Sequence, residues 1–298
     1  MSGPGSHPQP ASATGVAGKF AALARIFPPT LARGLRHADA FRDIEAVCLF
    51  VGYPRSGHTL VGALLDAHPD AVIAHEMDLL RFVYARFFRS QLCAMLVDNA
   101  RRAAATGHTW GTYAYAVPGQ WQGRFRRIRV IGDKHGEATS VRLHFSPSLL
   151  ERTARTFRHP VKLIHVIRNP YDNIATISRK PHTIQPALAP PSGDVLRDAI
   201  EYYFALCAAV ERVRRAGRYD VMDVRHEAFV ADPAASLTAI GRFLGLAMDD
   251  DYLRAASAIV NPAPLPSRTS IDWPAPRIAE VAERMRAFPF LEGYGFEE

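Results

Sequence analysis

The sequence predicts an α/β fold, a three-layer P-loop-type domain in which helices flank a central parallel sheet. Short apolar runs rich in β-branched residues alternate with longer segments of helical periodicity, which is typical of a parallel sheet covered on both faces. The first such run, 46–51, leads into Gly52-x-x-x-x-Gly57. That glycine spacing between a strand and a helix is typical of a phosphate-binding loop.

The composition permits a single large domain. Of the 298 residues, 48% are hydrophobic, which is enough for a substantial core. The 36 Lys and Arg exceed the 29 Asp and Glu, and the formal charge of +7 suits a polyanionic ligand. The sequence contains no zinc-finger spacing and no RNP-like aromatic motif, so we expect no nucleic-acid partner.

The N-terminal region and the cysteines indicate the compartment. Residues 1–18 are rich in Ser, Pro, Gly and Ala, and we expect a disordered tail followed by one domain over 19–298. No apolar stretch approaches the roughly 18 residues of a membrane span, and we find no signal-peptide pattern. Cys48, Cys93 and Cys207 are far apart in sequence and are expected to be buried and reduced. These features predict a soluble cytoplasmic protein.

The first half of the chain is expected to contain three strands and three helical segments. The strands are predicted over 46–51, 70–75 and 128–133. The apolar spacing predicts helices over 19–42, with a break at Pro28-Pro29, directly after Gly57, and over 79–104. Between these elements, 107–123 has few charges and four aromatic residues, which are Trp110, Tyr113, Tyr115 and Trp121. We interpret it as a loop or lid, whose aromatic side chains either line an acceptor pocket or serve ordinary packing.

The second half begins with its most apolar strand, 161–168, which we expect at the centre of the sheet. A further strand is predicted over 219–225. Helices are predicted over 147–157, from 170, over 194–215, over 233–245 and over 277–287. Three of them begin with a capping side chain followed by proline, as at Asp232-Pro233. The proline-rich segments 181–193 and 261–276 are expected to be irregular.

The phosphate-binding loop departs from that of nucleotide hydrolases. Its backbone N–H groups and the following helix dipole favour an anion. His58 replaces the lysine that should follow Gly57, whereas Arg55 places a permanent cation inside the loop. A neutral imidazole cannot replace an ammonium beside a β- or γ-phosphate. The variant argues against an ordinary ATPase or kinase and suits a nucleotide whose reactive anion lies near its 5′ end.

Charged residues follow the predicted strands. The strand ends bring Arg55 to Thr59, Glu76, Lys134 with His135, Arg168, and Arg225 to Glu227. In a parallel sheet, ligands bind at these carboxyl ends. A carboxylate among cations indicates a transferase, because the cations stabilise a moving anionic group and the carboxylate accepts a proton.

Two motifs resemble those of sulfotransferases. Tyr53-Pro-Arg-Ser-Gly-His-Thr-Leu60 resembles the family's 5′-phosphosulfate loop. Arg168, followed eight residues later by Thr176, resembles its 3′-phosphate motif. The likeness to the tyrosylprotein branch is closest over Val51 to Glu76, although His58 and Thr176 replace the more usual Thr and Ser. That branch's membrane anchor and cysteine framework are not recognisable in this sequence.

The resemblance implies that the donor is 3′-phosphoadenosine 5′-phosphosulfate (PAPS), bound by a single sulfotransferase domain. It assigns the 5′-phosphate and sulfuryl group to Arg55, Ser56, Gly57, His58, Thr59 and Leu60. It assigns the 3′-phosphate to Arg168 and Thr176, with Arg179 as a further contact. Ser267 and Arg268 lie where family members close a loop over the nucleotide.

The resemblance also implies catalytic roles. Glu76 falls at the position of the catalytic glutamate, which removes the proton of the acceptor hydroxyl. Lys134 matches a lysine that stabilises the bridging oxygen, and Arg55 assists it. His135 is a rival base, because the small-molecule branch uses a histidine in this region. We expect no metal, since no carboxylate cluster with ligand spacing occurs in the sequence.

The acceptor stays open at this point. The aromatic residues near 110–121 favour a small hydroxyl-bearing molecule, and a carbohydrate or a peptide tyrosine are alternatives. Two other classes compete with a sulfotransferase: a P-loop nucleotide kinase or ATPase, and a nucleotide-binding module without catalysis. The sequence does not predict an oligomeric state.

Overall fold

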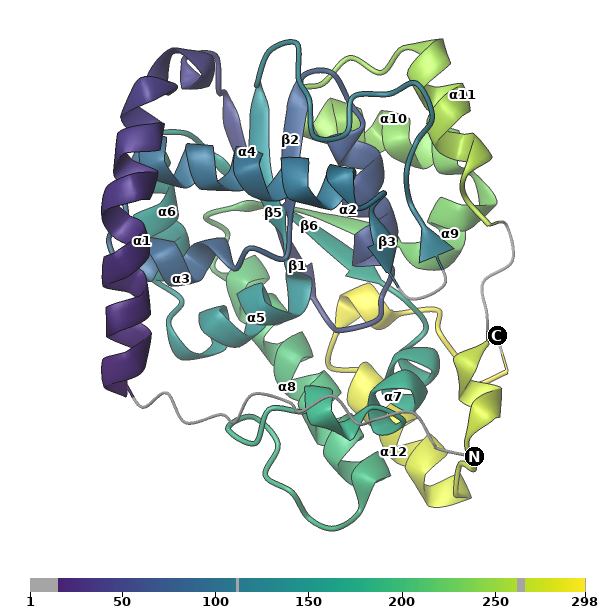
Figure 1. Ribbon diagram of the computed structural model, residues 1–298. Helices are drawn as coiled ribbons and strands as arrows, with labels where there is room; N and C mark the ends of the chain where they lie inside the picture. Colours follow the sequence, from purple (N-terminus) through teal and green to yellow (C-terminus); the bar gives the residue numbers. More distant parts are fainter. Residues whose placement is uncertain (1–15, 111–112, 262–265, 298) are drawn as a thin grey trace, which may run out of the picture.

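A computed structural model describes residues 16–110, 113–261 and 266–297 and has a five-stranded parallel sheet at its centre (Figure 1). The strand order is β2-β5-β1-β6-β7, and every neighbouring pair is parallel. The strands are β1 (Ala46–Gly52), β2 (Ala71–His75), β5 (Val130–Lys134), β6 (Val161–Ile167) and β7 (Asp220–Arg225). This confirms the predicted α/β fold class.

The strand β1 is the organising element of the sheet. Its seven residues are all buried, and it pairs with β5 on one side and β6 on the other. The chain order reverses at this point, and such switch points are where open α/β sheets bind ligands. The register pairs Gly52 with Val166 and, across β2 and β5, His75 with Lys134. The carboxyl ends of four strands therefore lie along one edge.

Helices cover both faces of the sheet because alternate side chains of β1 point to opposite sides. Val47, Leu49 and Val51 belong to a core that packs under the first helical layer, whereas Cys48 and Phe50 belong to the core on the opposite face. The first layer contains α1 (Val16–Arg36), α3 (Leu79–Tyr84), α4 (Arg89–Ala105) and α6 (Leu149–Phe157). The second contains α2 (His58–Asp66), α9 (His226–Ala231), α10 (Pro233–Leu244) and α11 (Asp250–Ala258).

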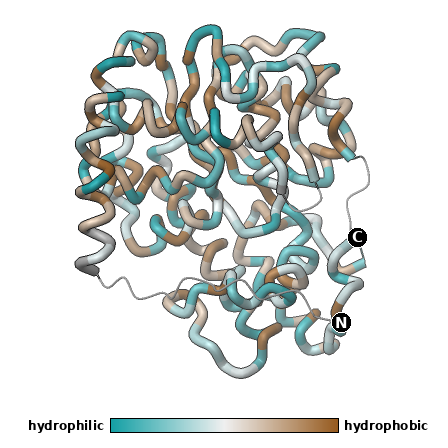
Figure 2. Tube along the Cα trace, viewed as in Figure 1, coloured by the Kyte–Doolittle hydropathy of each residue, from teal (hydrophilic) through white to brown (hydrophobic). Residues whose placement is uncertain are grey.

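A third apolar cluster lies beyond the carboxyl edge of the sheet. It surrounds Tyr53 and is enclosed by α5 (Gly136–Phe145), α7 (Pro170–Ser178), α8 (Val195–Arg215) and α12 (Ala275–Met285). A small hairpin, β3 (Thr109–Trp110) and β4 (Tyr113–Ala114), belongs to the predicted lid. Hydropathy changes repeatedly along the helices that surround the sheet (Figure 2), as expected for helices with one buried face.

The predicted break of the first helix is wrong. The helix α1 continues through Pro28 and Pro29, although each proline removes a backbone donor. Tertiary contacts hold this part of α1 against α4. The buried Gln91 of α4 donates to the Phe27 carbonyl at 2.8 Å and to the Thr30 hydroxyl at 2.7 Å. Residues 1–15 of the predicted tail lie outside the described residues, whereas 16–18 already belong to α1.

The predicted helix over 79–104 is two helices, α3 and α4. Arg86 has a left-handed φ of 62°. The Phe87 N–H donates to the Phe82 carbonyl and the Arg86 N–H to the Val83 carbonyl, both at 3.1 Å, which is the Schellman pattern that ends a helix. The apolar period continues across this break because Phe82 and Phe87 pack against each other. Periodicity alone could therefore not locate it.

Three further helices, α5, α9 and α11, were not predicted. In α5 polar residues share the buried face with the apolar ones, so its periodicity is weak. The remaining predicted strands and helices are confirmed, with ends that differ by a few residues. Among the described residues, no helix combines the length and the apolar character that crossing a membrane requires.

Candidate functional site

The phosphate-binding loop predicted from the glycine spacing lies between β1 and α2. Gly52, Arg55 and Gly57 have φ values of 128°, 70° and 95°, and α2 begins directly afterwards at His58. A non-glycine residue such as Arg55 is uncommon in this region and is often found at binding sites. The first N–H groups of a helix have no partner within it and lie at the positive end of its dipole. The loop therefore has the form of an anion cradle.

Two buried side chains hold the loop from beneath. The Ser56 hydroxyl donates to the Tyr53 carbonyl at 3.0 Å. The Asn173 amide, from α7, donates to the Pro54 carbonyl at 2.6 Å. Both Ser56 and Asn173 are fully buried. Ser56, predicted to contact the cofactor, thus uses its hydroxyl to shape the loop, and Asn173 is a supporting residue that the sequence analysis did not find.

The side chain of His58 is a structural support. Its Nε2 lies 3.1 Å from the Val51 carbonyl and donates to it. Burial lowers the pKa of His58 to about 3, so the ring is neutral at pH 7. The Leu60 side chain is buried in the apolar core. His58 and Leu60, both predicted to bind the cofactor, therefore offer it their backbone N–H groups.

A buried lysine and a carboxylate meet beside the loop. Lys134 ends β5, and its Nζ donates to Glu76 Oε1 at 2.8 Å and to Thr59 Oγ1 at 3.1 Å. The register of β2 and β5 explains this contact, because His75 pairs with Lys134 and Glu76 comes next. The Lys134 side chain is 2% exposed and that of Glu76 33%. The structure thus brings three predicted site residues into one polar group.

The charges of this pair depend on one another. Burial lowers the pKa of Lys134, and the neighbouring Glu76 carboxylate partly reverses this shift. Burial alone would raise the pKa of Glu76, but the charge and hydrogen bond of Lys134 bring it below its ordinary value. Glu76 is therefore ionised at neutral pH and can accept a proton.

Two further carboxylates, those of Asp133 and Asp78, fix the segment that carries Glu76. Glu76 and Asp78 have left-handed φ values of 56° and 66°. The buried Asp133 carboxylate accepts hydrogen bonds from the N–H groups of Met77 at 3.0 Å and Leu79 at 2.8 Å. Asp78 also forms a two-point ion pair with Arg142 of α5. The sequence analysis missed the supporting roles of Asp133 and Arg142.

Two histidines flank the Glu76–Lys134 pair. Burial and the charge of Lys134 lower the pKa of His75 to about 4, so this ring is neutral at pH 7. His135 precedes α5. Its Nδ1 is buried and has no hydrogen-bond partner within the described part of the chain. Both histidines interact electrostatically with Glu76, so the rival base His135 lies near this pair.

The second predicted anion group joins the loop directly. Arg168 follows β6, the neighbour of β1, and its Nη1 donates to the Arg55 carbonyl at 3.3 Å. Its Nη2 donates to Ser267 Oγ at 3.0 Å. Burial lowers the pKa of Arg168, and the nearby carboxylates Asp172 and Glu227 oppose that shift. The two loops predicted to bind opposite ends of a nucleotide are therefore adjacent.

The 267–270 segment closes against α7 through polar contacts. Arg268 forms an ion pair with Asp172 at 3.1 Å, and its N–H donates to the same carboxylate at 2.7 Å. Arg179 donates to Ser270 Oγ at 2.9 Å. The Thr176 hydroxyl donates to the Asp172 carbonyl within its own helix at 2.9 Å and keeps its acceptor capacity. All the predicted contacts to the 3′ end thus surround one helix.

The chain matches a family model described as "Sulfotransferase family" over residues 49–250. This segment contains the anion cradle, the Glu76–Lys134 pair and Arg168. The chain belongs to the sulfotransferase family.

The chain is also similar to several known proteins. The sulfotransferase is 26% identical over 236 residues to "Protein-tyrosine sulfotransferase 2" of Gallus gallus, with 76% of this chain aligned. It spans only 58% of the length of that relative. A solved sulfotransferase domain from the curacin biosynthetic pathway aligns with a TM-score of 0.53 at 16% identity, over 82% of this chain and 97% of that one. A sulfotransferase domain from the Synechococcus PCC 7002 olefin synthase gives a TM-score of 0.49 at 18% identity, over 82% and 94%.

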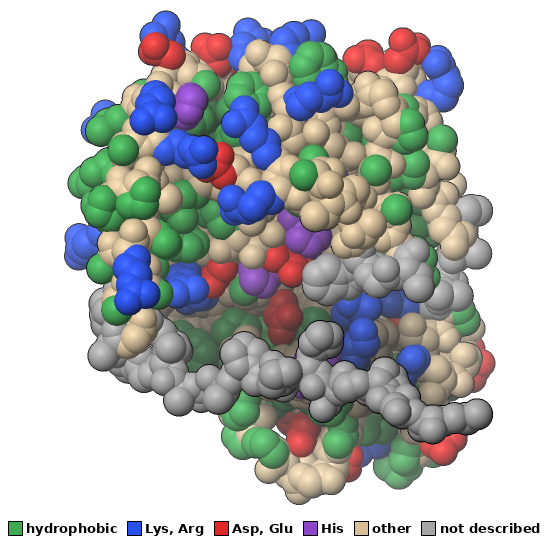
Figure 3. Space-filling model, in the orientation of Figure 1, with side chains coloured by type: hydrophobic (Ala, Val, Ile, Leu, Met, Phe, Trp, Pro, Cys, Tyr) green, Lys and Arg blue, Asp and Glu red, His purple; other side chains and the backbone are tan. Residues whose placement is uncertain are grey.

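The predicted lid of the sulfotransferase places aromatic rings near Arg55. Tyr113 and Tyr115 stack with ring centres 6.3 Å apart. Burial raises the pKa of Tyr115, and the charge of Arg55 acts against that rise. The lid is fastened to α2, where the Gly123 N–H donates to Asp66 at 3.1 Å. Residues 111–112 of this lid lie outside the described residues. Histidine, acidic and basic side chains gather near a hollow in the centre of the face shown in Figure 3.

His226 is a loop-side residue of the sulfotransferase that the sequence analysis gave only as part of the strand-end group Arg225 to Glu227, without a role of its own. It follows β7, and a Cβ atom added to Gly57 would lie 2.5 Å from its Nδ1. The ring therefore packs directly on the cradle. Its neighbour Glu227 accepts from the Asn169 N–H and the Tyr294 hydroxyl, both at 2.8 Å, and so fixes the start of α7. Their position at a strand end was the signal that indicated them, and it did not reveal these contacts.

The described residues contain no group of three His, Cys, Asp or Glu side chains arranged to hold a metal ion. The three cysteines are buried and free, as predicted.

Proposed function

We propose that this sulfotransferase takes the sulfuryl group of PAPS and transfers it to an aryl hydroxyl, with a tyrosine of a protein or peptide as the preferred acceptor. The observation that carries the choice of donor is the contact between Arg168 and the Arg55 carbonyl. It joins two cationic anion-binding groups at the ends of neighbouring strands, as a nucleotide with phosphate groups at both its 3′ and 5′ positions requires.

The residues around the two loops fit this donor. The guanidinium of Arg55 has no hydrogen bond or ion pair with the described residues and is available to an anion. Together with the N–H groups of His58, Thr59 and Leu60, it offers a cradle for the 5′ end. Arg168, Thr176 and Arg179 offer the 3′ end a guanidinium pair and a hydroxyl.

The site chemistry follows from the ion pair. When bound, the donor supplies a sulfuryl group attached to a phosphate that can leave. Glu76 is ionised at neutral pH and removes the proton of the acceptor hydroxyl. Lys134, which lies within hydrogen-bond distance of both Glu76 and Thr59, stabilises negative charge that develops toward the loop. Arg55 adds a second cation on that side.

The acceptor class rests on two observations. The relative from Gallus gallus is named as a protein-tyrosine sulfotransferase, which favours a peptide tyrosine over the small molecule that the sequence analysis preferred. The stacked pair Tyr113–Tyr115 near Arg55 suits a flat aromatic acceptor of either kind. A small phenol is therefore the second candidate.

The kinase or ATPase alternative is disfavoured by His58. An imidazole with a pKa of about 3 carries no charge at pH 7, so the position after Gly57 lacks the cation that ordinarily contacts β- and γ-phosphates.

Calorimetry with 3′-phosphoadenosine 5′-phosphate (PAP), compared with ATP plus magnesium, tests the donor. We expect tight binding of PAP that persists with EDTA. Preferential, magnesium-dependent binding of ATP would refute the proposal. Transfer of labelled sulfate from PAPS to a tyrosine peptide, its phenylalanine counterpart and a panel of small phenols then tests the acceptor. If only the phenols are labelled, the proposed peptide acceptor is wrong, whereas PAPS as the donor is still supported.

A further inference from the structure

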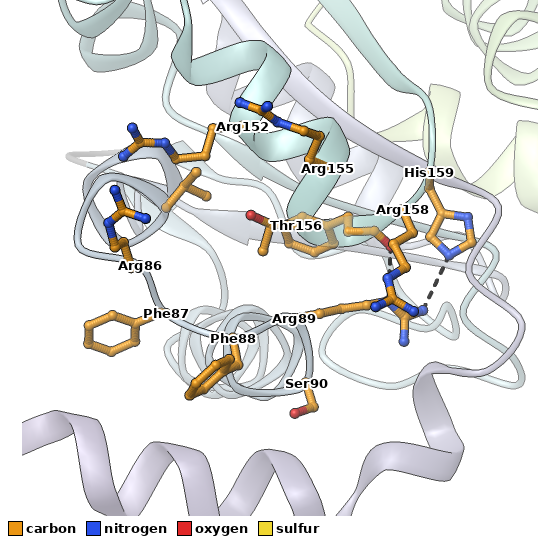
Figure 4. A pocket seen from close by; sticks show the side chains of 12 residues that line it. Arg86, Phe87, Phe88, Arg89, Ser90, Arg152, Arg155, Thr156, Arg158 and His159 are labelled. Carbon is orange, nitrogen blue, oxygen red and sulfur yellow. Dashed lines mark hydrogen bonds between the residues drawn. The ribbon is translucent and has the colours of Figure 1, made fainter.

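A basic pocket lies away from the strand ends that carry the site. It has a volume of about 960 Å³. Five arginines line it, which are Arg86, Arg89, Arg152, Arg155 and Arg158, and no acidic residue does. Figure 4 shows their side chains arranged around an open space between the start of α4 and the helix α6. This pocket belongs to neither anion group described above.

The pocket is separated from the nucleotide loops by the length of a strand. Arg158 and His159 precede β6, whereas Arg168 follows it. Seven parallel residues rise about 20 Å, so the pocket lies at the amino end of β6 and the loops at its carboxyl end. A molecule bound at the two nucleotide loops therefore leaves the pocket free.

Two of the arginines are unpaired within the part of the chain that the structure describes. The guanidinium groups of Arg86 and Arg158 have no hydrogen bond or ion pair with these residues. Both have left-handed backbones, with φ of 62° and 61°, at positions after α3 and α6 where glycine is the usual residue. Arginine thus occupies two positions where the backbone favours glycine.

The other arginines are held in place by carbonyl groups and a weak surface ion pair. Arg89 donates to the carbonyls of Phe157 at 3.1 Å and Phe41 at 2.7 Å, which fixes the floor of the pocket. Arg155 lies 3.5 Å from Glu151, and both side chains are more than half exposed. Such exposed pairs contribute little. Most of the positive charge in the pocket therefore has no nearby counter-charge.

The start of α4 adds to this charge. Arg89 is the first residue of this 17-residue helix, and Ser90 also lines the pocket. The first N–H groups of a helix lack partners within it and favour anions. The guanidinium groups and the helix end therefore act in the same direction.

The limited extent of the positive surface restricts the size of the ligand that the pocket can bind. On one side of the pocket, Tyr84 and Phe88 are large exposed apolar side chains, 60% and 56% exposed. On the α6 side, the Glu151 carboxylate lies 3.5 Å from Arg155. The positive surface is therefore bounded and does not continue as a track for a nucleic acid strand. A volume of this size suits a discrete molecule, and guanidinium groups from two elements suit several anionic groups.

We propose that this pocket is a second anion-binding site, which takes a compact polyanion with two or more phosphate or sulfate groups. It is independent of the proposed donor site. Its guanidinium groups bind the ligand oxygens from the α3–α4 connection on one side and from α6 on the other.

Titration calorimetry of the whole chain with inorganic tripolyphosphate tests this proposal. The test variant is Arg86→Gly/Arg158→Gly, in which glycine suits the left-handed backbone and preserves folding. The matched control, Arg197→Ala/Arg242→Ala, removes the same charge at two exposed arginines outside the pocket. Arg168→Ala removes the nucleotide-loop site. Circular dichroism checks that each variant is folded.

We expect wild type to show two binding events. In the pocket variant, the affinity of one event should fall at least tenfold. In Arg168→Ala, the affinity of the other event should fall. In the control, neither affinity should fall to a comparable extent. Equal affinity in the pocket variant and the control would overturn the proposal. Tighter binding of a polyglutamate peptide or single-stranded DNA at this pocket would overturn the assignment to a compact polyanion. PAP should compete with tripolyphosphate only at the event that is weakened in Arg168→Ala. The experiment therefore distinguishes failure of the donor proposal from failure of the pocket proposal.

Discussion

Replacement of Gly136 by alanine tests whether the anion cradle depends on the position of His58. A Cβ atom at residue 136 would lie 2.4 Å from His58 Nε2, whereas an ordinary contact is at least 3.4 Å. The buried ring must therefore move by about 1 Å, which breaks its hydrogen bond to the Val51 carbonyl. The backbone of Gly136 is not left-handed, so the clash is the principal effect.

The magnitude follows from three contributions. Loss of a buried hydrogen bond costs about 1–3 kcal/mol, and overpacking costs about 1–3 kcal/mol. Replacing glycine by alanine in a helix stabilises the folded protein by at most about 1 kcal/mol. With midpoints of about 2 kcal/mol for each loss and a gain of about 1 kcal/mol, we expect Gly136→Ala to lower the free energy of unfolding by about 3 kcal/mol. Because His58 is the first residue of α2, PAP binding should also weaken about tenfold, as expected for a displaced cradle.

Urea titration and calorimetry measure the two effects, and the background His58→Ala separates the clash from other causes. In that background the added methyl group meets no imidazole, so Gly136→Ala should cost much less. An equal loss of stability in both backgrounds, or unchanged stability and PAP affinity in the single variant, would refute this reasoning.

Three further predictions concern the site. Glu76→Gln should lower kcat by about 10²–10⁴ with PAP affinity nearly unchanged, and equal loss of both in rate and binding measurements would count against the base assignment. Arg168→Ala should weaken PAP binding by about ten- to a hundredfold, because a charged hydrogen bond contributes roughly 1.5–3 kcal/mol; calorimetry that finds wild-type affinity would contradict this. His58 has a folded pKa of about 3 against an ordinary 6.5, so the unfolded state takes up the proton first as the pH falls. Stability should decline between pH 6.5 and 3 by up to about 4–5 kcal/mol, and His58→Gln should flatten this profile. Parallel stability profiles of the two proteins would exclude that linkage.

The sequence was sufficient to predict the sheet and the edge at which the charged residues meet. Parallel strands place their carboxyl ends together, so residues that follow separate apolar runs had to converge. Arg55, Glu76, Lys134 and Arg168 were expected together for this reason, and hydrogen bonds now connect Lys134 to Glu76 and Arg168 to the loop.

The supporting contacts could not be predicted, because they depend on tertiary packing rather than on period or spacing. Asn173 is one turn inside α7, and nothing in its local sequence indicates that its amide reaches Pro54. Asp133 reads as the polar end of a strand, yet it accepts two N–H groups of another segment. Tertiary contacts also hold α1 on either side of its prolines, since Gln91 of a distant helix donates to Phe27 and Thr30.

The contact between Glu76 and Lys134 has a consequence for timing. Before substrates arrive, the carboxylate is already neutralised by an ammonium group, so a stray water molecule finds a weak proton acceptor. Under the proposed function, an incoming sulfonated nucleotide would compete for that ammonium and release the carboxylate to act as base. We therefore expect initial-rate patterns to show donor binding before acceptor binding. Random-order kinetics with wasteful cleavage of the donor would be the opposite behaviour.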